Sequence, residues 1–178
     1  LAGIILFKRN VDSIEQVAEL NESARHAAPV NSPPIIAVDQ EGGRVVRLRE
    51  PLTVIPCARR FGELDNAEIT HKAGKLVGCE LASLGFTLNF APVCDVDTNP
   101  NSPIIGDRAY GSSSEKVIKH SLAFARGLIS GGIIPCSKHF PGHGDTALDS
   151  HLSLPTVSHD IDRLNNVELR PFAAWAEA

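Results

Sequence analysis

The sequence predicts an α/β protein built on a parallel sheet. Short β-rich runs alternate along the chain with longer stretches of helical periodicity, which is the pattern of repeated strand–helix units. The runs are apolar for most of their length, as expected of strands that are covered on both faces. Polar and charged residues gather directly after each run. Because parallel α/β folds carry their active sites at that end of the strands, the functional residues are expected there.

Four strand–helix units are expected in chain order. Their strands are predicted at residues 3–7, 35–39, 86–93 and 133–140. Their helices are predicted at about residues 12–28, 66–84, 113–130 and from 160 to the end of the chain. The serines at 112–114 are capping candidates for the third helix, and Gly85 and the glycine pair at 131–132 end helices before the next strand.

The chain is predicted to be part of one larger domain. A complete eight-unit barrel typically needs about 250 residues, and four strands cannot close one. The sequence of 178 residues contains no internal repeat, low-complexity tract or linker, so residues 1–178 are assigned to a single, incomplete domain.

Composition excludes several classes of protein. With 43% hydrophobic and 21% charged residues the chain has the composition of a globular protein, and no apolar run is long enough to cross a bilayer. The formal charge is −4 with scattered Lys and Arg, so neither a nucleic acid nor a membrane is expected as a partner. The four cysteines form no CxxC pair and are interpreted as buried free thiols, which favours a reducing compartment, the cytoplasm.

The densest cluster of reactive side chains is the segment KHFPGHGDTALDSH at residues 138–151. Asp149 and His151 stand two residues apart, so in an extended loop their side chains can point the same way. An Asp beside a His fixes the orientation and tautomer of the imidazole and stabilises its protonated form, as a proton-transfer group requires. The alternative is a solvated loop whose histidines only cap and turn.

A metal site is a second hypothesis for this loop. His139, His143, Asp149 and His151 are suitable zinc ligands. Their spacing argues against it, because the intervening glycines do not place the ligands at the regular helical interval of a HExxH motif.

The segment VDQEGGRVVR at residues 38–47 predicts a sugar-binding loop. A carboxylate at the end of a strand followed by paired glycines places an acceptor at the mouth of a site where the backbone can approach a ligand. Asp39 is expected to accept from vicinal hydroxyls, with Arg47 donating from the side. A phosphate loop is not favoured because no GKS or GKT follows; a tight turn with an exposed ion pair is the alternative.

A long polar loop follows the third predicted strand, from NFAPVCDVD into IIGDRAYG. Ordering such a loop is costly unless it has a function, and Arg108 is its best candidate for ligand contact. Asp95 is expected to be structural, because an Asp that closes a strand often only accepts hydrogen bonds from the following turn.

Taken together, the segments VDQEGGRVVR, NFAPVCDVDTNP, IGDRAYG and KHFPGHGDTALDSHLSLP resemble, in this order and spacing, the catalytic barrel of glycoside hydrolase family 3. The chain is most similar to the β-N-acetylglucosaminidase branch, which includes bacterial enzymes of peptidoglycan recycling. The resemblance extends over essentially all 178 residues. It implies a TIM-type (β/α)8 barrel, of which this chain would supply about strands 2 to 5 with their helices.

The resemblance also implies roles for particular residues. His151 and Asp149 match the acid/base dyad, in which His151 acts first as acid and then as base. Five other residues match positions that bind the terminal N-acetylglucosamine: Asp39, Arg47, Arg108, Lys138 and His139. No cofactor or metal is implied, and the expected ligands are N-acetylglucosamine-containing glycosides or muropeptides.

The implied reaction is retaining exo-hydrolysis through a covalent glycosyl-enzyme. The family's nucleophile is an Asp on a late barrel strand, which this sequence does not reach, so no Asp of this chain is assigned that role. A neutral His repels an anion less than a carboxylate does, which leaves phosphorolysis open. An inactive, truncated sugar-binding fragment and a metal-dependent hydrolase remain the alternative functions.

Overall fold

The computed structural model describes residues 2–100, 102, 104–146 and 156–178. Its centre is a four-stranded parallel sheet in which neighbouring strands follow the order of the chain, β1-β2-β3-β4. The strands are β1 (Gly3–Leu6), β2 (Ile35–Val38), β3 (Leu88–Asn89) and β4 (Ile134–Pro135). The prediction of four parallel strands is confirmed, although β3 and β4 are much shorter than the apolar runs that contain them.

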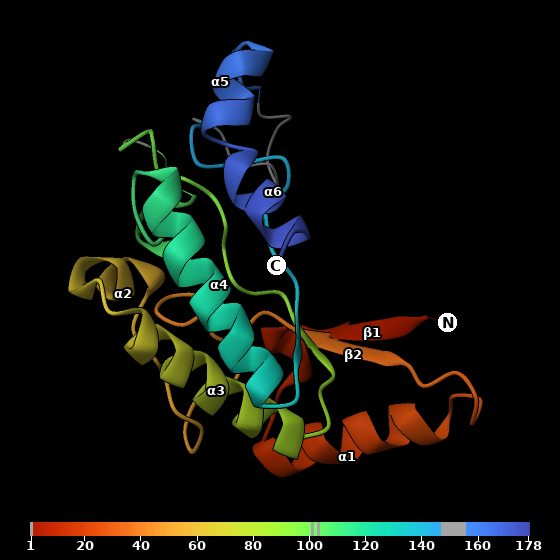
Figure 1. The fold of residues 1–178 in the computed structure, drawn as a ribbon. Coiled ribbons are helices and arrows are strands. Elements are labelled where there is room, and N and C mark those ends of the chain that lie inside the picture. Colours follow the sequence, from red (N-terminus) through yellow and green to blue (C-terminus); the bar gives the residue numbers. More distant parts are fainter. Residues whose placement is uncertain (1, 101, 103, 147–155) are drawn as a thin grey trace.

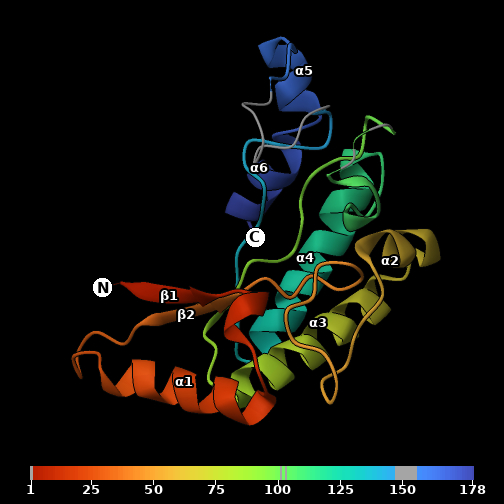
Figure 2. The same cartoon turned by 180° about the vertical axis from the view of Figure 1, so that it is seen from behind.

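Six α-helices accompany the sheet in the described residues. They are α1 (Ile14–His26), α2 (Ala58–Leu64), α3 (Ala67–Ser83), α4 (Ser114–Ser130), α5 (Ile161–Asn166) and α6 (Arg170–Ala176). Two 3-10 turns, η1 (Lys8–Asn10) and η2 (Gly106–Arg108), lie in the loops that follow strands. Figures 1 and 2 show α3 and α4 side by side, and α5 and α6 at the opposite end of the molecule from α1.

Side-chain caps explain where the three long helices begin. Ser13 accepts a hydrogen bond from the backbone of Gln16 at the start of α1, and Asn66 accepts two from the first turn of α3. Ser113 caps α4, as the run of serines predicted. Each cap satisfies a backbone N–H that has no partner inside its helix, which is typically worth about 1 kcal/mol.

The packing of α3 against α4 depends on glycines. A Cβ atom on Gly74 would stand 2.3 Å from the carbonyl oxygen of Phe124, and one on Gly127 would stand 2.2 Å from that of His71. The two backbones therefore touch where these glycines face each other. This close contact brings the buried side chains of Val77, Leu81, Phe124 and Leu128 into the same core as β2.

Two sequence expectations need correction. The single helix predicted from residue 160 is in fact two short helices, and α2 was not predicted. The cysteines are free, as expected, but only Cys94 is fully buried and Cys79 is exposed on α3.

No helix in the described part of the chain combines the length and the apolar character needed to cross a bilayer.

Candidate active site

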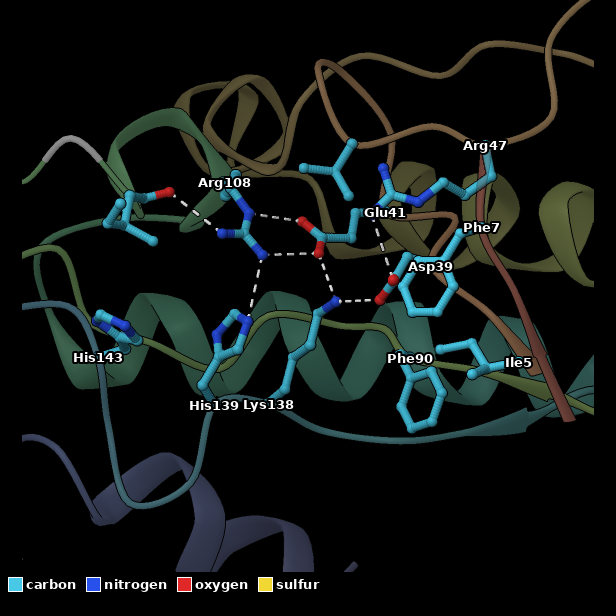
Figure 3. A pocket seen from close by; sticks show the side chains of 12 residues that line it. Ile5, Phe7, Asp39, Glu41, Arg47, Phe90, Arg108, Lys138, His139 and His143 are labelled. Atoms are coloured by element: carbon cyan, nitrogen blue, oxygen red, sulfur yellow. Dashed lines mark hydrogen bonds and ion pairs between the residues drawn. The ribbon is translucent and has the colours of Figure 1, made fainter. Parts of the chain in front are cut away.

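The carboxyl ends of the strands meet at a pocket of about 500 Å³ (Figure 3). This volume is in the range of small-molecule sites. The charged and polar lining consists of Asp39, Glu41, Arg47, Arg108, Lys138, His139 and His143. The apolar lining consists of Ile5, Phe7, Val45, Phe90 and Ile104. All five residues predicted to bind sugar are therefore brought together at one pocket, although the chain carries them on separate segments.

The ionic side chains form a row of alternating charge. Arg47 Nη2 lies 3.3 Å from Asp39 Oδ2, and Lys138 Nζ lies 2.7 Å from Asp39 Oδ1. Lys138 Nζ also lies 2.5 Å from Glu41 Oε1, and Glu41 in turn accepts two hydrogen bonds from Arg108, at 2.8 and 2.9 Å. Figure 3 shows this row running across one wall of the pocket.

The row keeps its carboxylates ionised. Burial alone would raise the pKa of Asp39, but Lys138 and Arg47 outweigh it and hold that pKa below its usual value. The same balance lowers the pKa of Glu41, where burial is overcome by Arg108 and Lys138. Burial disfavours the charged form of Arg108 as well, yet the contact with Glu41 raises its pKa. Both carboxylates therefore act only as hydrogen-bond acceptors near neutral pH.

Buried Gln40 folds the loop that carries Arg47 back to Asp39. Its side-chain oxygen accepts from the backbone N–H groups of Arg47 (2.9 Å) and Leu48 (3.1 Å), and its side-chain nitrogen donates to the carbonyl of Leu48 (2.7 Å). Its backbone exchanges two hydrogen bonds with the side chain of Asn89, which fixes the end of β2 against β3. Gln40 thus connects the beginning of the predicted sugar-binding loop to its end at Arg47 and Leu48.

The glycine pair in this loop is required by the tight turn. Gly42 and Gly43 have φ values of 103° and 55°, which L-residues rarely adopt. A Cβ on Gly42 would also stand 2.6 Å from the carbonyl oxygen of Pro56. The turn lets the chain reverse directly after Glu41 and return Arg47 to the pocket.

Arg108 reaches the pocket from η2 in the long loop after β3. Its Nη1 donates to the carbonyl of Ile104 at 3.2 Å, in addition to its two bonds with Glu41. Only 12% of its side chain is exposed, and 6% of that of Glu41. This pairing joins Arg108, in the loop after β3, to Glu41 after β2, and agrees with the prediction that Arg108 lies at the site.

Lys138 and His139 follow β4 and both line the pocket, although they are adjacent in sequence; the peptide bond between them is cis. His139 Nδ1 lies 2.6 Å from Oδ2 of Asp95, and His139 Nε2 lies 3.3 Å from Nη2 of Arg108. Asp95 itself is fully buried and does not line the pocket.

The predicted acid/base residues, Asp149 and His151, lie outside the described residues, so their placement stays a prediction. The described beginning of their loop, at His143, reaches the pocket. Asp149 and His151 are also two of the four proposed metal ligands, so the metal hypothesis likewise depends on residues outside the described part. Among the residues that the structure does describe, no group of three or more His, Cys, Asp or Glu side chains is arranged to hold a metal ion.

Sequence reasoning missed Glu41 and gave Asp95 only a structural role. A signal for Glu41 was present, because residues two apart in an extended segment point to the same side, and Glu41 is two residues beyond Asp39. For Asp95 the sequence offers no signal, since its contact with His139 joins two separate segments.

The family model for the glycosyl hydrolase family 3 N-terminal domain matches residues 1–178. The chain belongs to this family. Family 3 membership agrees with the parallel strand order and with a site at the carboxyl ends of the strands, and the sheet is part of a TIM-type barrel. The fold predicted from the sequence is thereby confirmed.

Relatives of this family 3 chain are named hexosaminidases. The chain is 40% identical to "Beta-hexosaminidase A" of Pseudoalteromonas piscicida, over 100% of its own length and 31% of the relative's. A solved family 3 β-N-acetylglucosaminidase from a Paenibacillus species is 42% identical, with a TM-score of 0.94 over 100% of this chain and 34% of that one. NagZ from Neisseria gonorrhoeae, solved in complex with N-trifluoroacetyl-D-glucosamine, is 36% identical, with a TM-score of 0.94 over 99% and 53%. The chain therefore spans only a third to a half of these proteins.

Proposed function

We propose that the protein containing this chain is a retaining β-N-acetylglucosaminidase that removes terminal β-linked N-acetylglucosamine, and that residues 1–178 are one part of its catalytic domain. The observation that carries the proposal is the pocket of alternating charge at the carboxyl ends of the strands, in a chain of family 3. The ligand in the NagZ complex is a glucosamine derivative, which supports the choice of sugar.

The row of ion pairs suits a ligand rich in hydroxyl groups. A sugar hydroxyl both donates and accepts, so it can bond to a carboxylate and to a neighbouring cation at once. Asp39 stands between two such cations, Lys138 and Arg47. Cationic side chains and carboxylates are balanced in and directly behind the pocket, which favours a neutral sugar over an anionic ligand such as free phosphate.

The chemistry is assigned to residues outside the described part. His151, oriented by Asp149, protonates the glycosidic oxygen while an Asp on a later strand attacks the anomeric carbon. The alcohol departs with that proton, leaving a glycosyl ester on the Asp. Water then attacks the anomeric carbon and gives a proton to His151 as the ester bond breaks, so the configuration is retained.

The test varies the leaving group in His151→Ala of the full-length protein. A natural glycoside needs the proton, so its hydrolysis should fall by roughly 10²- to 10⁴-fold. A nitrophenyl glycoside hardly needs it, so its first step should be much less affected while the glycosyl-enzyme accumulates. The control is His26→Ala, on the exposed last turn of α1, which should hydrolyse both substrates at the parent's rates. Equal slowing of the first step with both substrates would refute the acid role.

The two alternative functions are separated by simple measurements. Activity of the full-length protein that follows its zinc content, and is lost on chelation, would favour a metal-dependent hydrolase. Tight sugar binding without turnover would favour a sugar-binding fragment. Muropeptides belong to the proposal through the sequence resemblance, and a cytoplasmic location belongs to it through the free cysteines. Comparing N-acetylglucosamine release from muropeptides and from chitobiose tests the choice of substrate.

A further inference from the structure

His139 lies between a carboxylate and a guanidinium, and this arrangement determines its tautomer. Its Nε2 faces Arg108 Nη2 at 3.3 Å. Because a guanidinium has donors but no acceptor, Nε2 must be the acceptor in this contact and carry no proton. The proton of the neutral ring is then on Nδ1, which donates it to Oδ2 of Asp95 at 2.6 Å.

Asp95 has the contacts of a positioning residue. Its side chain is 0% exposed and does not line the pocket, so it has no route to a ligand. Oδ1 accepts from the backbone N–H groups of His139 (3.3 Å) and His143 (2.6 Å), which leaves Oδ2 for the imidazole. The carboxylate of Asp95 has only acceptors. In the Nε2–H tautomer the unprotonated Nδ1 would face this carboxylate with a lone pair, and the two would repel, so that tautomer is excluded.

The tautomer decides what this end of the pocket can bind. With the proton on Nδ1, a sugar hydroxyl can replace the direct contact between His139 and Arg108. The hydroxyl then donates to the Nε2 lone pair and accepts the N–H that Arg108 releases. With the proton on Nε2, two N–H groups would face each other and no acceptor would remain at that point. A donor left unsatisfied in a partly buried site weakens binding by about 5- to 100-fold.

We propose that Asp95 is a positioning residue for sugar recognition, which holds His139 as a hydrogen-bond acceptor next to Arg108. The inference rests on the proposed function, because it identifies how that same pocket recognises its sugar. It goes beyond the sequence expectation, in which Asp95 only accepts hydrogen bonds from the following turn.

The decisive variant is Asp95→Asn in the full-length protein. The amide has the same shape, and its oxygen can still accept from the two backbone N–H groups. Its nitrogen then faces Nδ1 of His139 with a donor, which forces the imidazole proton to Nε2. The expected results are a switch of the His139 tautomer in ¹⁵N NMR spectra and a loss of N-acetylglucosamine affinity of about 5- to 100-fold.

A double-mutant cycle separates this role from a purely structural one. In a His139→Ala background no imidazole is left to orient, so Asp95→Asn should cause no further loss of affinity. The same loss in both backgrounds would overturn the proposal. So would an Nε2–H tautomer in the unmodified protein, a measurement that does not require any variant to fold.

Failure of the proposed function gives a different result. An unmodified full-length protein that neither binds N-acetylglucosamine nor cleaves its aryl glycosides would contradict the assigned sugar, whatever the tautomer of His139. An unmodified protein that binds the sugar, with an Asp95→Asn variant that binds it equally well, would leave the function intact and refute the role of Asp95.

Discussion

At the scale of a single residue, a substitution of Asp39 tests the proposed sugar binding. Its carboxylate is held between Lys138 and Arg47 and stays ionised, so it can accept hydroxyl hydrogen bonds in the bound substrate and in the transition state alike. Asp39→Ala should therefore raise KM roughly 10- to 100-fold, the loss of a hydrogen bond to a charged group, with a smaller change in kcat.

Steady-state kinetics of the full-length protein on an aryl N-acetylglucosaminide provide the measurement. Asp12→Ala, at an exposed position before α1, is the matched control and should leave both constants unchanged. An unchanged KM with a collapsed kcat would instead make Asp39 a catalytic residue.

At the same scale, the sequence was sufficient for residues that follow strands and insufficient for those that act through another side chain. Asp39 and Lys138 lie toward the carboxyl ends of predicted strands, so parallel topology alone predicts that they meet. Asp95 also follows a strand, but its role depends on the distance between its carboxylate and the ring of His139. That distance is set by the fold of two loops, which no local pattern encodes.

At the scale of the elements, long periodic helices were predictable and short ones were not. The prediction for α4 began one residue before the observed helix, because a capping serine marks its start. By contrast, α2 has seven residues, an internal glycine and no side-chain cap, and it depends on packing of Phe61 against the core. The break between α5 and α6 had a signal in Pro171, which lacks the N–H that a continuous helix needs.

The contact between α3 and α4 gives a prediction at this scale. Replacing Gly127 by Ala gains up to about 1 kcal/mol of helix propensity. The new Cβ would stand 2.2 Å from the carbonyl oxygen of His71 and 2.7 Å from the backbone nitrogen of Lys75, and backbone atoms cannot rotate away. We expect the clash to prevail and the free energy of unfolding to fall by about 1–3 kcal/mol.

Urea unfolding of the full-length protein measures this change. The control is Arg126→Ala, an exposed position next to Gly127 on the same helix, which should change stability by less than about 0.5 kcal/mol. A variant at Gly127 that is as stable as the parent would show that the helices can separate at no cost.

At the scale of the whole molecule, the strand order explains why residues from separate segments meet at one site. Strands that are neighbours in sequence are neighbours in the sheet, so the loops after β2, β3 and β4 all end at one edge. The two outer strands, β1 and β4, each keep an exposed isoleucine, Ile5 and Ile134. Such a sheet is a partial barrel, consistent with a chain that spans only a third to a half of its relatives.

Stability of the whole molecule in acid gives the last prediction, through the contact of Asp65 with α4. Hydrogen bonds from His120 and Lys119 lower the pKa of Asp65 to about 2, from an ordinary value of 3.8. A carboxylate with a depressed pKa stabilises the folded state above its unfolded pKa, and this contribution is lost as the pH falls toward its folded pKa. Asp65→Asn keeps a residue that tolerates the left-handed backbone there, φ 52°, while removing the charge. The Tm difference between parent and variant should shrink by roughly half between pH 5 and pH 3, where Asp65 begins to take up a proton. A difference that stays constant down to pH 3 would show that the charge of Asp65 does not stabilise the contact. Hydrogen bonds that do not depend on this charge would then hold the end of α2 against α4.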